Sequence, residues 1–205
     1  MKVVELFSGT ESFSKAAREL GHETFTVDND SSFNPDLLAD AENLRIGDFP
    51  WFMPDIIWAS PPCESFSVAT IGKNWVDWRP SEKALMGIRL VTKTLELIMG
   101  LRPTFYFIEN PRGMLRSLRI MSDLPKRTVT YCQYGETRMK PTDIWTNCDV
   151  WESRPPCNNG DPCHESAPRG ARMGTQGIKG ARDRAIVPRE LCLEILEDID
   201  GKRLF

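Results

Sequence analysis

The chain of 205 residues lacks several features that mark particular classes of protein. It has no long, uninterrupted hydrophobic run, so we expect no segment that spans a bilayer. Its N-terminus leads directly into the apolar run KVVELF, without a signal-peptide pattern. It also has no G-x-G-x-x-G sequence, so the usual dinucleotide site is not supported. These absences predict a soluble, cytoplasmic protein with no membrane partner.

Histidine is scarce, with two in the chain, whereas cysteine is not, with six. In an intracellular protein, cysteines are more often free thiols, nucleophiles or metal ligands than disulfides. Neither histidine lies near Cys63 in the sequence, so a Cys–His hydrolase is not supported.

The net charge of −3 does not by itself indicate a nucleic-acid binder, but the charge is unevenly spread. Residues 1–110 carry 10 Lys and Arg against 16 Asp and Glu, whereas residues 111–189 carry 14 against 8. A basic block of this kind is typical of a face that binds a polyanion, although ordinary surface charge gives the same pattern.

Apolar runs alternate with helical patterns along the chain. This alternation predicts an α/β fold with a doubly wound, mostly parallel sheet. We expect strands at 3–7, 23–27, 55–59, 104–109, 127–131 and 143–147, and helices at 11–20, 81–99 and 188–199. Residues 110–118 should form a turn that leads into a helix.

Polar residues follow the predicted strands at the points where those strands end. They are Ser8-Gly9-Thr10, Asp28, the stretch 60–63 and Glu109-Asn110. Because ligands bind beyond the carboxyl ends of strands in doubly wound sheets, we expect one site there. Gly9 would let the backbone approach a ligand, and Asp28 suits a ribose, so a nucleoside-bearing cofactor is indicated. A tight turn with an unrelated acidic residue is the alternative.

Cys63 lies in the stretch WASPPCESFS, directly after two prolines that fix the backbone. A thiol displayed in a loop after a strand can act as a nucleophile, although spacing alone equally fits a plain loop cysteine. Glu109 ends the buried run FYFIE, and a carboxyl group at the edge of a dry pocket can donate a proton near neutral pH. A salt-bridged or capping glutamate is the alternative there.

Three stretches, LFSGTESFSKAARELGHE, DIIWASPPCESFS and YFIENPRGM, occur in that order. They resemble the cofactor loop, the Pro-Cys nucleophile motif and the Glu-Asn motif of the cytosine-5 DNA methyltransferases. YCQYGETRMKPTDIWTN is similar to the later basic motif of that family, and RAIVPRELCLEIL to its closing motif and C-terminal helix. The resemblance covers most of residues 3–196. It implies one Rossmann-like, S-adenosylmethionine-dependent methyltransferase domain over 1–205, in a small, phage-like form from a bacterial or phage-infected cell.

The resemblance also implies a mechanism. The Cys63 thiolate would add to carbon six of a cytosine flipped out of double-stranded DNA, while Glu109 protonates nitrogen three. Carbon five could then take the methyl group of S-adenosylmethionine, after which a base removes its proton and the thiolate leaves. Arg138 would act as a further catalytic residue that contacts the base.

Further site residues follow from the same resemblance. Those expected around the cofactor are Phe7, Ser8, Gly9, Thr10, Asp28, Asn29, Asp40, Pro62 and Leu90. Those expected at the DNA are Ser67, Lys140, Arg169 and Arg172.

The chain departs from the family pattern at several positions. Glu11 stands where the cofactor loop usually has a second glycine, and Glu64 where the nucleophile is usually followed by Gln. Pro111 replaces a usual Val, Ala185 replaces a usual Asn, and the basic motif lacks its usual Arg repeat. We still expect activity, because Cys63 and Glu109 are present.

The chain is also short where the family inserts a target-recognition domain. Only a Cys-, Gly- and Arg-rich stretch, 148–187, stands there. We therefore expect a short recognition site, such as a dinucleotide, or dependence on a second subunit. The stretch 71–80 would form the mobile catalytic loop, in which Trp75 and Trp78 either wedge beside the vacated base or pack the loop against the body.

Cys148, Cys157, Cys163 and His164 lie within this stretch. Three thiolates and an imidazole can complete a tetrahedral zinc site, which would be structural. Unligated cysteines are the alternative. The following basic run, with Arg169 and Arg172, predicts contacts to DNA phosphate or guanine, or else a disordered basic loop.

Two other functions remain open on the sequence. One is an RNA cytosine methyltransferase with the same core. The other is a catalytically silent DNA-binding or regulatory relative, and the departures at Glu11 and Glu64 are the reason to retain this alternative.

Overall fold

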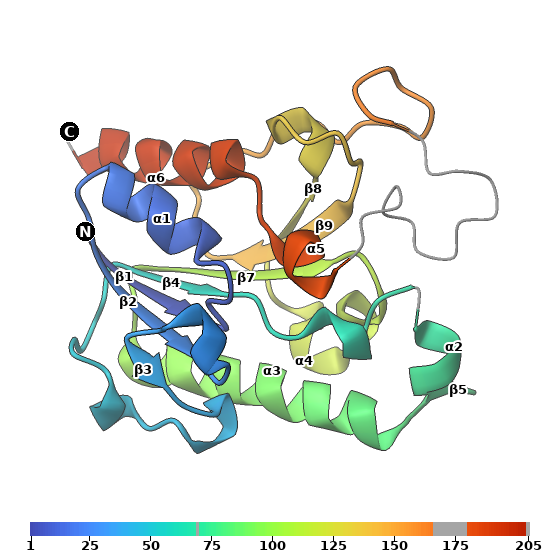
Figure 1. Ribbon diagram of the computed structural model, residues 1–205, viewed down its shortest axis with the longest axis horizontal. Helices are drawn as coiled ribbons and strands as arrows, with labels where there is room; N and C mark the ends of the chain where they lie inside the picture. Colours follow the sequence, from blue (N-terminus) through green and yellow to red (C-terminus); the bar gives the residue numbers. More distant parts are fainter. Residues whose placement is uncertain (69, 166–179, 204–205) are drawn as a thin grey trace.

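The computed structural model describes residues 1–68, 70–165 and 180–203, and its centre is a seven-stranded sheet (Figure 1). The strand order is β3-β2-β1-β4-β7-β9-β8. In this order, the neighbouring strands β3, β2, β1, β4 and β7 are parallel to one another, whereas β9 is antiparallel to both of its neighbours. The prediction of a doubly wound, mostly parallel sheet is therefore confirmed. The strands are β1 (Lys2–Leu6), β2 (Glu23–Asp28), β3 (Leu37–Leu38), β4 (Ile56–Ala59), β7 (Phe105–Pro111), β8 (Lys126–Thr130) and β9 (Pro141–Thr146).

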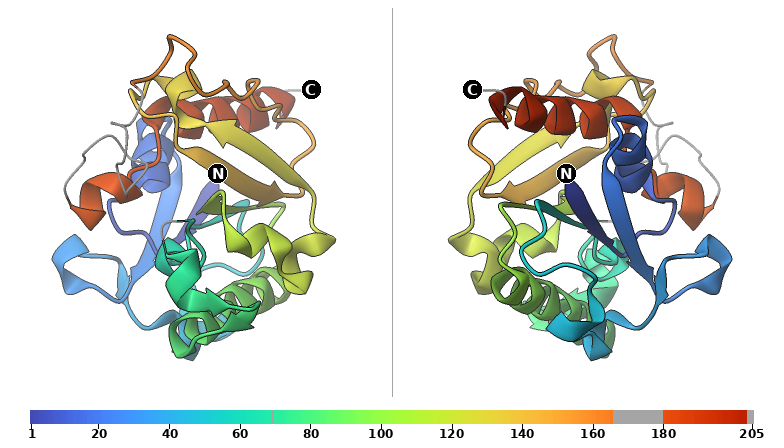
Figure 2. Two further views of the ribbon diagram at one scale, coloured as in Figure 1. Left: turned by 90° about the vertical axis from the view of Figure 1, so that its right-hand side faces the viewer. Right: turned by 90° about the vertical axis from the view of Figure 1, so that its left-hand side faces the viewer.

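Helices cover both faces of the sheet, as Figures 1 and 2 show. On one face lie α1 (Ser12–Glu19) and α6 (Arg189–Arg203), which contact each other. On the other lie α3 (Glu82–Leu101) and the short α4 (Arg119–Ser122). The neighbours Val3 and Val4 enter different core clusters, because successive side chains of a strand point to opposite faces.

Sequence signals at the helix ends account for two boundaries. The Ser81 side chain accepts a hydrogen bond from the N–H of Ala84 and so caps α3. Pro188 immediately precedes α6, where its missing N–H costs no helical hydrogen bond. Among the described residues, no helix is both long and apolar enough to cross a membrane.

The turn expected to lead into a helix over 110–118 begins two residues later than the sequence predicts. Strand β7 runs on to Pro111, which pairs with Thr142 of β9, so the backbone remains extended there. A 3-10 turn, Met114–Ser117, follows, and α4 begins only at Arg119. The pairing with a strand 31 residues later in the chain, which the local sequence does not reveal, extends β7.

The remaining elements lie at the edges of this frame. A short helix, α2 (Ile71–Asn74), leads into the hairpin of β5 (Trp75–Val76) and β6 (Arg79–Pro80). The described part of 148–187 contains one helix, α5 (Ala181–Ala185), and otherwise no regular element. Arg169 and Arg172 lie outside the described residues.

Candidate active site

A cavity of about 640 Å³ opens at the carboxyl ends of β1, β4 and β7. This volume is in the range that holds a ligand of nucleoside size. Its lining includes nine residues predicted from the sequence: Phe7, Ser8, Gly9, Thr10, Pro62, Cys63, Ser67, Glu109 and Lys140. The cavity therefore brings the predicted nucleophile, the predicted proton donor and the predicted cofactor loop together. The stretch from Arg184 to Val187, at the end of α5, closes one side.

The loop after β1 is held in place by β2. The N–H of Ser8 donates to the Val27 carbonyl at 3.1 Å, and that of Gly9 to Oδ2 of Asp28 at 2.8 Å. Gly9 has a φ of 44°, which glycine adopts without strain. Asp28 does not itself line the cavity, so within the described structure its role is to fix the loop. The buried Ser8 hydroxyl lines the cavity and has no hydrogen-bond partner among the described residues.

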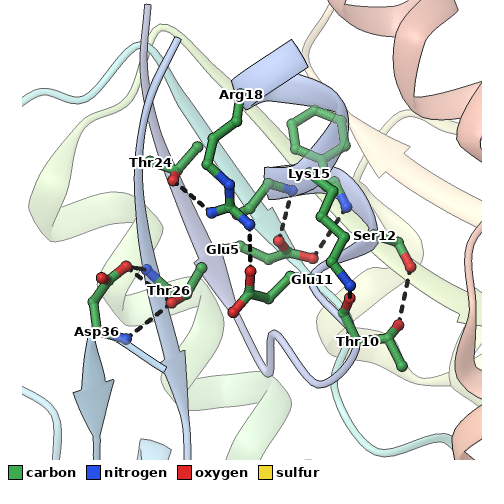
Figure 3. Close-up of polar contacts among 11 residues, drawn as sticks. Glu5, Thr10, Glu11, Ser12, Lys15, Arg18, Thr24, Thr26 and Asp36 are labelled. Atoms are coloured by element: carbon green, nitrogen blue, oxygen red, sulfur yellow. Dashed lines mark hydrogen bonds and ion pairs between the residues drawn. The ribbon is translucent and has the colours of Figure 1, made fainter. Parts of the chain in front are cut away.

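Glu5 lies at the base of this cavity and was not predicted from the sequence. Its carboxyl group is buried and accepts hydrogen bonds from the N–H groups of Phe13 and Ser14, at the start of α1 (Figure 3). Burial raises the pKa of Glu5 to about 7, and the hydrogen bonds from Ser14 and Phe13 oppose that rise. The sequence signal that could have identified Glu5 is a charged residue within an otherwise apolar strand.

Glu11, the departure in the cofactor loop, adopts a left-handed conformation with a φ of 56°. Glycine takes this conformation freely, which explains why a glycine suits the position. The Glu11 carboxylate forms an ion pair with Arg18, seven residues later in α1 (Figure 3). This contact offsets part of the backbone strain.

Cys63 begins a 3-10 turn, Cys63–Ser65, directly after Pro62, and its side chain is half-buried. Burial raises the pKa of the Cys63 thiol, and the charge of Glu109 raises it further, whereas Lys140 opposes both. The adjacent Glu64 raises it too, but the Glu64 carboxylate turns outward to an ion pair with Lys83 of α3. The unusual carboxylate is thus partly neutralised by a lysine.

Glu109 occupies the end of β7 and is held by a residue that the sequence did not indicate. The Tyr131 hydroxyl donates to Oε1 of Glu109 at 2.9 Å. The next residue, Asn110, donates from Nδ2 to the Pro61 carbonyl at 2.8 Å. That bond ties the end of β7 to the loop that carries Cys63.

Arg138 and Lys140 approach the same region from the segment before β9. The Arg138 side chain is 2% exposed, its Nε donates to Glu136 at 3.1 Å, and its Nη1 is buried without a partner among the described residues. It does not line the cavity, whereas Lys140 does. Lys140 Nζ lies 4.5 Å from the centre of the Tyr131 ring and donates to the Arg184 carbonyl at 2.9 Å. Burial lowers the pKa of Lys140, although Glu109 opposes the change.

Besides Asp28, three predicted cofactor residues do not line the cavity. Asn29 is exposed, and the Asp40 carboxylate accepts from the N–H of Glu42 and so caps a 3-10 turn, Ala41–Asn43. Leu90 packs against the core on the α3 face of the sheet. Nothing in the geometry brings these three to the ligand space.

The two tryptophans of the loop after Cys63 behave differently. Trp75 is 9% exposed, and its Nε1 donates to the Ser65 carbonyl at 2.8 Å. It therefore packs the loop against the body, as the alternative interpretation held. Trp78 is 77% exposed at the tip of the β5–β6 hairpin and is available to a partner.

A cluster of three thiols and an imidazole lies outside the cavity. Its members are Cys132, Cys157, Cys163 and His164, whose ligand atoms are all within 4.8 Å of one another. The prediction of Cys148 in this set is wrong. Cys148 follows β9 closely and is buried in the core between the sheet and α6, whereas Cys132 takes its place.

Comparison with known proteins agrees with these features. The model of the family described as C-5 cytosine-specific DNA methylase matches residues 1–121. A protein of Frog virus 3 (isolate Goorha), described as a probable DNA (cytosine-5)-methyltransferase, is 31% identical over 96% of this chain and 99% of its own length.

Two solved structures share the fold at low identity. A methyltransferase of Entamoeba histolytica, EhMeth, aligns with a TM-score of 0.55 at 10% identity, over 76% of this chain and 57% of its own. A structure described as a DNA modification methyltransferase encoded within an E. coli prophage aligns with a TM-score of 0.52 at 18% identity, over 82% of this chain and 57% of its own. The chain thus spans little more than half of these two structures.

The family model matches more than half of the chain, and the viral relative matches almost all of it. The chain belongs to the cytosine-5 DNA methyltransferase family.

Proposed function

We propose that the protein transfers a methyl group from S-adenosylmethionine to carbon five of cytosine in double-stranded DNA, through a covalent adduct at Cys63. The observation that supports this most directly is that Cys63 and Glu109 line one cavity together with the loop after β1. A nucleophile, a proton donor and a cofactor loop are the groups that this reaction requires.

The cavity residues fit the cofactor. The Ser8 hydroxyl, which has no partner among the described residues, and the half-buried turn at Gly9 would hold the methionine part. Asp28 does not line the cavity but lies at the end of β2, where a ribose binds in such sheets. The cofactor supplies an electrophilic methyl group. None of the four residues of the thiol–imidazole cluster lines this cavity, so a metal held there would not act on the base.

The protein residues would act in sequence on the base. Cys63 loses its proton to solvent and its sulfur bonds to carbon six, while Glu109 gives a proton to nitrogen three. Carbon five then becomes nucleophilic and takes the methyl group as the bond between that group and the cofactor's sulfur breaks, which leaves S-adenosylhomocysteine. A base removes the carbon-five proton, the bond between the Cys63 sulfur and carbon six breaks, the thiolate leaves, and nitrogen three returns its proton to Glu109. Arg138 does not line the cavity, so its contact with the base requires that Nη1, which is buried without a partner among the described residues, move toward the cavity.

Access to the cavity requires that the cytosine leave the duplex. Trp78, exposed on the hairpin that follows the nucleophile loop, is the side chain suited to fill the vacated position. The short insertion between β9 and α5 favours a short recognition site, and a second subunit remains a prediction. Ser67 and Lys140, both in the cavity lining, are placed to contact the flipped nucleotide.

Bisulfite sequencing of DNA from cells that express the chain tests the activity and reports the sequence context of the methylated cytosines. Wild type should methylate, and Cys63→Ser should not. An oligonucleotide with 5-fluorocytosine should form an adduct of wild type that survives denaturation. No adduct under conditions where DNA binds would support the catalytically silent alternative. Methylation of RNA but not of duplex DNA would support an RNA methyltransferase.

A further inference from the structure

We propose that Cys132, Cys157, Cys163 and His164 bind one structural zinc ion, which fastens the insertion after β9 to the turn that carries Tyr131. This Cys₃His set is not the set indicated by the sequence, because its first ligand lies between β8 and β9, outside the insertion.

The distances between ligand atoms approach those of a tetrahedral site. Nδ1 of His164 lies 3.6 Å from Sγ of Cys157 and 3.6 Å from Sγ of Cys163. Bonds of about 2.3 Å to sulfur and about 2.0 Å to nitrogen require about 3.5 Å between S and N, and about 3.8 Å between two sulfurs. The Cys132–Cys163 pair, at 3.6 Å, is close to that value. The Cys132–Cys157 pair, at 3.1 Å, must open by about 0.7 Å, a small change for two side chains.

The backbone around the cluster holds these residues together independently of a metal. The N–H of Cys157 donates to the Thr130 hydroxyl at 3.0 Å, and that of Glu165 to the Thr137 carbonyl at 2.9 Å. Gln133 Nε2 lies 3.5 Å from Sγ of Cys163, where it can donate to a metal-bound thiolate. The turn Tyr131–Tyr134 and the insertion after β9 thus bring their ligand atoms together without a metal.

The composition of the cluster favours zinc over the alternatives. A disulfide between Cys132 and Cys157 would need only two of the four residues and would give Cys163 and His164 no role. Iron–sulfur clusters are usually held by four cysteines. Thiolates with one imidazole in a compact tetrahedron are typical of structural zinc.

The insertion needs such a fastening because it has no core of its own. No residue of 152–165 is buried, and small segments of this kind rely on metals or disulfides. Cys132 directly follows Tyr131, whose hydroxyl binds Glu109, so the metal would also steady the turn next to the proton donor. The cluster does not line the cavity, and its effect on catalysis would be one of position.

Metal analysis of the purified full chain by mass spectrometry tests the proposal without any assay of methylation. We expect about one zinc per chain. Cys163→Ser, a change at an exposed residue, should lower the content at least fivefold, and Cys132→Ser should do the same. Cys63→Ser and Cys148→Ala, which change cysteines outside the cluster, should keep full zinc. Circular dichroism of each variant checks that it folds.

Three results would overturn the proposal. The first is wild type, expressed with zinc and kept reduced, that contains under a tenth of an equivalent. The second is a different metal in the site. The third is four rather than six free thiols per denatured chain with Cys132 and Cys157 cross-linked, which would identify a disulfide instead. Because the readout is metal content, an inactive but zinc-loaded protein would contradict only the methyltransferase proposal.

Discussion

The Tyr131 hydroxyl donates a 2.9 Å hydrogen bond to Oε1 of Glu109, and both side chains are buried. Burial, followed by the charge of Glu109, raises the pKa of Tyr131 well above its usual value, so this hydroxyl is a fixed donor at neutral pH. Tyr131 does not line the cavity. It therefore acts through Glu109, whose orientation it holds.

Removal of that hydroxyl in Tyr131→Phe should slow methyl transfer with little change in KM for DNA. A hydrogen bond to a charged group contributes about 1.5–3 kcal/mol, which corresponds to roughly 10- to 100-fold in kcat if all of it positions Glu109. Steady-state kinetics with labelled cofactor measure this. Tyr134→Phe is a matched control, because its buried hydroxyl accepts from the N–H of Arg154 and not from or to Glu109. Equal losses in both variants would contradict a positioning role.

The reactivity of Cys63 should depend on Glu109 and Lys140 in opposite directions. Burial and the Glu109 charge raise the pKa of the thiol, and Lys140 lowers it. Alkylation by iodoacetamide should therefore quicken about tenfold per pH unit from pH 7 to 8. At pH 8, Glu109→Gln should react faster than wild type and Lys140→Met more slowly. Peptide mass spectrometry follows the Cys63 label.

This pair of variants separates charge from structure. Glu109→Gln should abolish methyl transfer while it makes the thiol more reactive. Unfolding around the site would quicken alkylation in both variants, whereas the charge effect slows it in Lys140→Met. Glu96→Gln, an exposed change on α3, should alter neither rate. A slower alkylation of Glu109→Gln would contradict the electrostatic coupling.

Substitution of Glu64, whose charge also raises the pKa of Cys63, should have a milder effect. Glu64→Gln should make the thiol slightly more reactive and keep methyl transfer, because no proposed step uses this carboxylate. The ion pair with Lys83 is more than half exposed on both sides, so its loss should change stability by under about 1 kcal/mol. The same alkylation assay measures the reactivity of the thiol, and unfolding in urea measures the change in stability. A complete loss of activity would give Glu64 a catalytic role.

Much of this site could be predicted from the sequence because strand ends carry it. Cys63, Glu109 and the loop 7–10 each follow a short apolar run, and parallel strands end at one edge of the sheet. The residues of the site that the sequence did not predict depend on pairing between segments that are distant in the chain. Tyr131 reaches Glu109, and Cys132 replaces Cys148, only because β9 pairs antiparallel with both β7 and β8. Nothing in the local sequence specifies that approach.

Gly113 has a structural role that the Glu-Asn motif alone does not reveal. A Cβ at this position would lie 2.2 Å from the Phe66 carbonyl oxygen, in the backbone of the loop that carries Cys63. Gly113→Ala should therefore push the two loops apart and destabilise the fold by about 1–3 kcal/mol, a fall of roughly 3–10 °C in Tm. Gly47→Ala, where a Cβ meets nothing within 4 Å, is the control. A Gly113→Ala protein with unchanged Tm and activity would show that the loops adjust freely.

The buried carboxyl group of Glu5 makes a definite prediction about pH. Its folded pKa is about 7, raised by burial from an ordinary value of 4.5. The protonated form is thus favoured in the folded state, so the stability that this group contributes is present below pH 4.5 and is lost as pH rises to 7. Glu5→Gln, which mimics the protonated form, removes that dependence.

Denaturation of wild type and Glu5→Gln between pH 5 and 8.5 isolates the contribution of this residue, since all other groups cancel in the difference. The unfolding free energy of the variant relative to wild type should rise with pH, by about 3 kcal/mol in total if the whole shift is realised. Glu23→Gln, at the exposed start of β2, should show no such trend. A flat difference for Glu5→Gln would mean that its hydrogen bonds to Phe13 and Ser14 fully offset burial, and that the carboxylate beneath the cavity is already charged at pH 5.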